Sequence, residues 1–85
     1  MQEQLWPSPE ESAAMNLRRA ISETRGDFVV EWIERGMEGY FVLFRRGTVV
    51  HREPGIDLAV LEQDGHRDEI RQLVQRVKGV FDRRG

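Results

Sequence analysis

The stretch Tyr40-Phe41-Val42-Leu43-Phe44 is the longest fully apolar run of the chain, and it decides which fold the sequence can adopt. Its aromatic and β-branched residues favour a strand. Successive side chains of a strand point to opposite faces of the sheet, so this run places large apolar groups on both faces. Such a pattern is typical of a central strand that is covered on two sides. We therefore expect residues 40–44 to form the middle of a sheet.

Two further β-patterns flank this run. Phe28-Val29-Val30-Glu31-Trp32-Ile33 precedes it and Thr48-Val49-Val50-His51 follows it, and each is separated from it by a segment that contains glycine. Arg46-Gly47 is short enough for a two-residue hairpin turn, whereas residues 35–39 predict a longer loop. Pro54-Gly55 should end the third strand. Together these signals predict a three-stranded antiparallel meander.

Helical patterns stand on either side of the meander. Ser8-Pro9-Glu10-Glu11 combines an N-cap residue, a proline suited to the first helical position and a capping-box glutamate. Apolar residues then recur at helical spacing up to the C-terminal signal Gly26, which predicts a helix over about residues 9–25. A second helix is expected over about residues 67–82. Its apolar positions are Ile70, Leu73, Val74, Val77 and Phe81.

These elements define the predicted fold class, which is a small α+β domain. A chain of 85 residues has room for one domain, so we assign residues 1–8 to an N-terminal tail and residues 9–85 to a single domain. Its order is helix, three-stranded antiparallel meander, helix, with the helices packed on the sheet. Residues 56–61 fit both a short fourth strand and a helical turn, and we favour the strand.

The faces of the sheet suggest a contact surface. With a turn at Arg46-Gly47, one face carries Tyr40, Val42, Phe44, Val49 and His51, and the other carries Phe41, Leu43, Arg45, Thr48, Val50 and Arg52. Two helices on the first face would leave an apolar stripe uncovered, whereas one helix on each face would leave none. We favour the first arrangement, with the stripe covered by a second copy, because a small core without disulfides gains from self-association.

The predicted function is therefore that of a small non-enzymatic interaction or assembly module, which binds a second copy or another protein. Its predicted interaction residues are Phe41, Leu43, Val50, Trp6, Arg45 and Arg52. The eight glycines stand singly and form no phosphate-binding loop, and no serine or threonine stands next to a histidine. The chain has no cysteine, which excludes disulfides and thiolate metal sites. We expect no catalytic residues, cofactor or metal.

Two alternatives remain open. A basic face with a stacking aromatic, Trp32 or Tyr40, would suit nucleic acid, although a net charge of −2 does not favour it. The arginine pairs that could supply this face are Arg18-Arg19, Arg45-Arg46 and Arg83-Arg84. The second alternative is a metal-assisted site around His51, with Glu53 and Asp57 as further ligands.

Composition also bears on location. No apolar stretch approaches the roughly 20 residues of a membrane span, and residues 1–4 lack the basic and apolar segments of a signal peptide. Lys78 is the only lysine beside many arginines, a bias that suits a GC-rich genome. We therefore expect a bacterial protein of the cytoplasm that makes no membrane contact.

Overall fold

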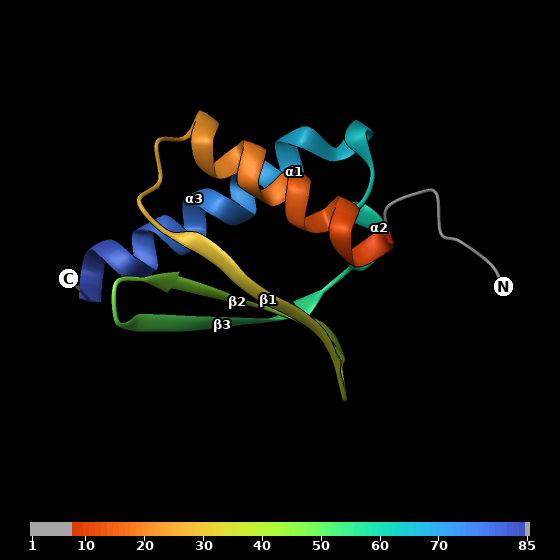
Figure 1. Ribbon diagram of the computed structural model, residues 1–85. Coiled ribbons are helices and arrows are strands. Elements are labelled where there is room, and N and C mark those ends of the chain that lie inside the picture. The colour runs from red at the N-terminus through yellow and green to blue at the C-terminus, as the bar shows by residue number, and fades with distance from the viewer. Residues whose placement is uncertain (1–7, 85) are drawn as a thin grey trace, which may run out of the picture.

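The computed structural model describes residues 8–84 and confirms the α+β fold (Figure 1). The elements in chain order are α1 (Pro9–Glu23), β1 (Val29–Gly36), β2 (Gly39–Arg46), β3 (Val49–Ile56), α2 (Leu58–Leu61), a 3₁₀ turn η1 (Asp64–His66) and α3 (Arg67–Arg84). The strands form one antiparallel sheet in the order β1-β2-β3, so the apolar run lies in the middle strand as predicted. Most of the predicted N-terminal tail, residues 1–7, lies outside the described residues.

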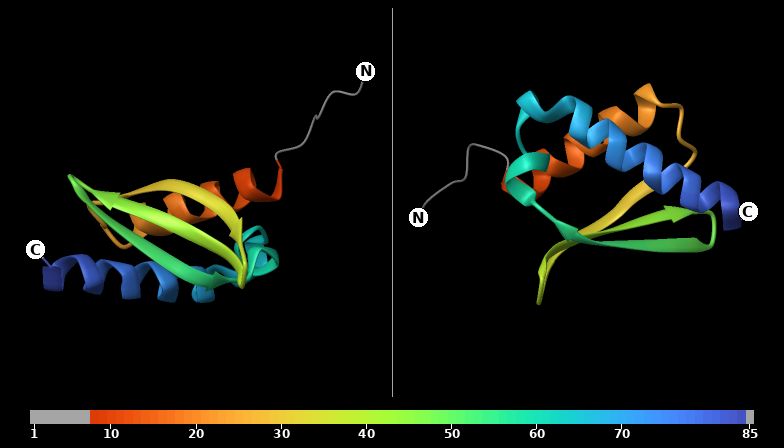
Figure 2. Two further views of the ribbon diagram at one scale, coloured as in Figure 1. Left: turned by 90° about the horizontal axis from the view of Figure 1, so that it is seen from below. Right: turned by 180° about the vertical axis from the view of Figure 1, so that it is seen from behind.

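Both long helices lie on the same face of the sheet, which gives the molecule two layers (Figures 1 and 2). On that face Val42 and Phe44 of β2 are completely buried. Phe41 and Leu43, which alternate with them, are only partly buried. The middle strand is therefore covered on one side, and its other side faces away from α1 and α3.

The core lies between the helices and the sheet, and the helical spacing seen in the sequence supplies most of it. Phe28 enters this core just before β1 and links the layers, because its ring centroid lies 5.7 Å from that of Phe44 and 5.1 Å from that of Phe81. The other buried apolar residues are Ala13, Leu17, Ala20 and Ile21 of α1, Val42 and Ile56 of the sheet, Leu61 of α2, and Ile70, Leu73, Val74 and Val77 of α3.

The ends of α1 follow from local hydrogen bonds. Ser8 Oγ accepts from the Glu11 amide at 3.1 Å and Glu11 Oε1 accepts from the Ser8 amide at 2.9 Å, which confirms the capping box. At the other end the left-handed residue is Arg25, with φ 57°, and not Gly26 as the sequence suggested. Gly26 is needed for space instead, because a Cβ there would lie 2.9 Å from Cε1 of Phe28.

The predicted turn between β2 and β3 was wrong by one residue. The turn is Gly47-Thr48 and Arg46 pairs with Val49, so Thr48 lies outside the strand. Gly47 adopts φ 62°, which favours glycine. The pairing of β3 against β2 is displaced by two residues from the expected one, and a displacement of two keeps every side chain on its predicted face.

The predicted end of β3 and the possible fourth strand were also wrong. β3 continues through Pro54-Gly55 to Ile56, with an irregularity in its pairing opposite residues 40–42. Proline is tolerated there because β3 is an edge strand, and Gly55 takes φ 68° at the irregularity. The residues after Ile56 form the short helix α2, because Asp57 Oδ1 accepts from the amide of Ala59 and caps its first turn.

A buried polar contact fixes α2 against α1. Nδ2 of Asn16 donates to the carbonyl oxygen of Leu61 at 2.8 Å, and Asn16 is the one polar residue among those buried in residues 8–84. The bond holds the connection from β3 to α3 against the middle of α1. Within this same range, no helix has the combined length and apolar character that crossing a bilayer requires.

Candidate interaction surface

The side of the sheet that faces away from α1 and α3 is the candidate interaction surface, and we call it the outer face. Residues that are directly paired across an antiparallel sheet point to the same side, so the register identifies its members. They are Val29, Trp32 and Glu34 of β1, Phe41, Leu43 and Arg45 of β2, and Val50 and Arg52 of β3. Glu31, at the register shift of β1, joins them through its hydrogen bonds to Arg45. The outer face therefore carries five of the six predicted interaction residues. The sixth, Trp6, lies outside the described residues.

Leu43 occupies the centre of the outer face. Trp32 pairs with it on the β1 side and Arg52 pairs with it on the β3 side, so these three form one row across the sheet. In the next row Arg45 lies between Val29 and Val50. The row on the other side of Leu43 contains Glu34 and Phe41.

The outer face exposes large apolar side chains. Trp32 is 58% exposed, Val29 is 56% exposed and Val50 is 41% exposed. Within residues 8–84 the other exposed large apolar residues are Met15, Met37 and Val49, so half of this group gathers on the outer face. Exposed large apolar residues that gather on one face of a small protein often mark a contact surface.

Charged groups divide the outer face into an acidic and a basic side. β1 contributes Glu31 and Glu34, whereas β2 and β3 contribute Arg45 and Arg52. The Arg45 guanidinium hydrogen-bonds both carboxylate oxygens of Glu31, with Nη2 at 2.8 Å from Oε2. This hydrogen bond holds the pKa of the Glu31 carboxyl below its usual value and raises the pKa of Arg45.

The other two charged residues of the outer face, Glu34 and Arg52, each contact an aromatic side chain. Nε1 of Trp32 donates to Oε1 of Glu34 at 2.7 Å, which fixes the indole on the surface. The guanidinium carbon of Arg52 lies 4.4 Å from the centroid of the Phe41 ring, a cation–π contact. Among the described residues, Glu34 and Arg52 form no ion pair with each other or with any other side chain.

The structure brings together only part of the predicted metal site. Nε2 of His51 lies 2.8 Å from Oε1 of Glu53, and Nη2 of Arg76 donates to the other oxygen of Glu53 at 2.8 Å. Burial opposes ionisation of Glu53, but the hydrogen bonds from His51 and Arg76 outweigh it and keep the pKa of Glu53 below its usual value. Asp57 is occupied in capping α2. Over residues 8–84, no three His, Asp or Glu side chains are grouped so as to hold a metal ion.

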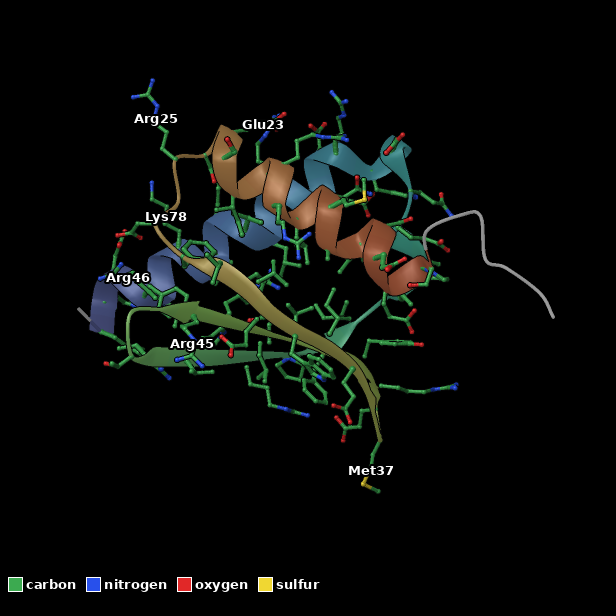
Figure 3. All side chains as sticks on the ribbon, viewed as in Figure 1. Glu23, Arg25, Met37, Arg45, Arg46 and Lys78 are labelled. Atoms are coloured by element: carbon green, nitrogen blue, oxygen red, sulfur yellow. The ribbon has the colours of Figure 1, made fainter. Side chains whose placement is uncertain are left out.

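The arginine pairs are distributed over three elements. Arg18-Arg19 lies on α1, Arg83-Arg84 lies at the end of α3, and the middle pair is split by the pleat of β2. Arg45 belongs to the outer face, whereas Arg46 lies on the helix side, with its Nη1 3.0 Å from Asp82 and 3.6 Å from Asp27 (Figure 3). The predicted basic face would have to be assembled from separate parts of the surface.

The predicted interaction residues did not include Trp32 and Val29, although Trp32 was considered as a stacking aromatic for nucleic acid. Strict alternation along β1 would place Trp32 beside Val30 on the helix side, but the register shifts between Val30 and Trp32. This irregularity leaves both Glu31 and Trp32 on the outer side, and nothing in residues 28–33 predicts it.

The chain matches no protein-family model, no curated protein and no solved structure.

Proposed function

We propose that this chain is a protein-interaction module that makes contact through its outer face. The observation that carries the proposal is the exposed cluster of Trp32, Val29 and Val50 around the central Leu43. Aromatic residues and arginine are enriched in the contact surfaces of proteins, and lysine is depleted. The outer face has two aromatic residues, two arginines and no lysine.

The size of the face agrees with this function. The three strands have eight residues each. At the usual strand spacing and rise, they cover about 14 Å by 26 Å, or roughly 380 Å² in outline. This outline has room, beside the charged residues, for an apolar patch of a few hundred Å², a size that often marks functional contact surfaces.

The charge pattern supports protein over nucleic acid as the ligand. Phosphate recognition needs a surplus of cations on one face, because each contact neutralises one phosphate. On the outer face the two arginines are matched by two glutamates, and Arg45 is already bonded to Glu31. Acidic side chains beside the stacking residue Trp32 would repel a phosphate backbone.

Site-specific photocrosslinking tests the proposal. We would place a photoreactive amino acid at Val50 on the outer face, and in a matched control at Gln75, which is exposed on α3. Irradiation of cells that make the protein should give polypeptide adducts from position 50 and few from position 75. Equal adduct yields from both positions, or adducts to nucleic acid alone, would overturn the proposal.

A further inference from the structure

We infer that the groove between α1 and the free edge of β1 binds an extended peptide of another protein, which adds to the sheet as a fourth strand antiparallel to β1. This site goes beyond the proposed function of the outer face, and the two share only Glu31 and Trp32 at their border. The open edge of β1, the lining of the groove and the charges along α1 each support the inference.

The free edge of β1 is an open hydrogen-bonding surface. β1 lies at one side of the sheet, and over residues 8–84 it forms no backbone–backbone hydrogen bond outside the sheet. The opposite edge, β3, is partly closed, because Nη1 of Arg84 donates to the Val50 carbonyl at 3.1 Å and Pro54 has no N–H. Main-chain hydrogen bonds along an open edge supply affinity for an extended peptide. β1 is therefore the edge at which a strand can be added.

The groove follows this edge and has an apolar floor. Of the three strands, α1 packs chiefly against β1. The groove between them has a volume of about 300 Å³, and its lining consists of residues 30–33 of β1 and Glu10, Glu11, Ala14 and Arg18 of α1. Residues 30–33 point to both faces of the sheet, so the groove runs along the edge itself. Ala14, Val30 and Ile33 are partly buried and form a floor for the side chains of an added strand.

The charges of α1 give the groove a direction. The hydroxyl of Tyr40, which pairs with Arg35 near the end of β1, donates to Oε2 of Glu10 at 3.3 Å. The start of α1 therefore lies beside the end of β1, and the two elements run in opposite directions. Glu10 and Glu11 lie at this end of the groove, and Arg18 lies about two helical turns further on, toward the start of β1. Among the described residues, none of these three charged side chains forms an ion pair.

These unpaired charges specify the chemistry of the peptide. A strand antiparallel to β1 begins beside Glu10 and Glu11, so its first residues should be basic. It ends beside Arg18, so its last residue should be acidic. Between Glu10 and Arg18 the helix rises about 12 Å, which an extended chain spans with about four residues. Every second residue of this stretch faces the floor at Ala14 and should be β-branched and apolar.

A second copy fits this edge less well than a short peptide. The pairing of β1 is irregular between Val30 and Trp32, and such irregularities oppose long edge-to-edge association of sheets. An antiparallel pair of β1 strands would also place both helix layers on the same face, with α1 against α1 of the partner subunit. An extended peptide has no helix layer and meets neither obstacle.

Titration of the isotope-labelled full chain with the peptide Lys-Lys-Val-Thr-Val-Thr-Glu, followed by NMR, tests the inference. We expect a dissociation constant of about 0.1–1 mM. The largest amide shifts should occur at Ala14 and residues 30–33, and residues 50–54 on the opposite edge should not shift. The N–H groups of a strand alternate in direction, so only one alternate set meets β1. N-methylation of the two valines and N-methylation of the two threonines should therefore weaken binding unequally.

Charge exchange tests the direction of the peptide. Arg18→Glu should weaken binding about threefold to fivefold, the effect of an exposed ion pair. A peptide that ends in lysine instead of glutamate should regain this loss. Arg19→Glu is the matched control, because Arg19 lies on α1 but turns toward Asp64, at 4.0 Å, and it should bind like the wild type. Circular dichroism checks that each variant keeps its fold.

Three results would overturn the inference. The first is the absence of amide shifts at about 5 mM peptide, well above the expected dissociation constant. The second is equal binding by the two N-methylated peptides, which would exclude pairing with the edge. The third is slow hydrogen exchange of every β1 amide in the free protein. At all concentrations it would mean that residues 1–7 of the chain occupy the edge, and at high concentration alone it would assign the edge to a second copy. Crosslinking from position 50 tests the outer face independently, so each of these results leaves the proposed function standing.

Discussion

Val42 and Leu43 are neighbours in β2 whose side chains lie on opposite faces, so the same substitution should act very differently at the two positions. Val42 is completely buried against the helix layer. Val42→Asp removes about 1.5–3 kcal/mol of apolar burial, and an unpaired charge in the core adds roughly 3–5 kcal/mol. A chain of this length has a free energy of unfolding of about 4–13 kcal/mol. We therefore expect Val42→Asp to be largely unfolded.

Leu43→Asp should leave the monomer folded. The side chain of Leu43 is only partly buried, and a carboxylate there stays in contact with water. The cost in the free energy of unfolding should be near 1 kcal/mol, which is ordinary for a substitution outside the core. The same change puts a charge at the centre of the proposed interaction surface, so the yield of polypeptide crosslinks from position 50 should fall.

Urea denaturation followed by far-UV circular dichroism compares the two variants directly. The reasoning is refuted if Leu43→Asp is as unfolded as Val42→Asp, because the outer face would then belong to the core of the monomer. It is equally refuted if Val42→Asp keeps a cooperative transition near that of the wild type. Leu43→Ala is a useful control, since it shortens the side chain without adding charge and should preserve the fold.

Three further outcomes follow from other contacts. Asn16→Asp turns the donor to the Leu61 carbonyl into an acceptor, so thermal melts should show a loss of about 3–5 kcal/mol at neutral pH, partly recovered in acid. The pKa of Glu53 is lower in the folded protein than its ordinary value of about 4.3. The ionised carboxylate therefore stabilises the folded state fully above that pH, and this stabilisation is lost as the pH falls through the folded-state pKa. Below about pH 5, the melting temperature of Glu53→Gln should therefore depend less on pH than that of the wild type. The exposed control Glu38→Gln should show the same pH dependence as the wild type. Oligonucleotide titration at low salt should show no binding, and salt-sensitive binding would instead favour the nucleic-acid hypothesis.

The sequence predicted the elements that depend on local chemistry. The capping box at Ser8 and Glu11 fixes the start of α1, and helical spacing identified the buried residues of α3. The faces of β2 and β3 were also predicted correctly, although the turn was misplaced. Misplacing the turn by one residue displaced the predicted pairing of β3 against β2 by two residues. Because side chains alternate between faces every two residues, each side chain kept its predicted face. Five of the six predicted interaction residues lie on the outer face for that reason.

The remaining features depend on tertiary structure. The register shift in β1 exposes Trp32, whereas residues 28–33 follow regular alternation in the sequence. Residues 58–61 became a helix because Asp57 caps them and Leu61 is held by Asn16 from α1. The contact with Asn16 is not visible from the segment alone. Asp57 is a possible cap signal within it, but the apolar spacing suits both a strand and a helical turn, and the strand was favoured.

The composition of the outer face explains why the chain does not cover it with one of its own helices. Burying Glu31, Arg45 and Arg52 beneath an apolar helix would remove their hydration, and an unpaired buried charge costs several kcal/mol. Packing both helices on the other face keeps these charges in water while Val42 and Phe44 are fully buried.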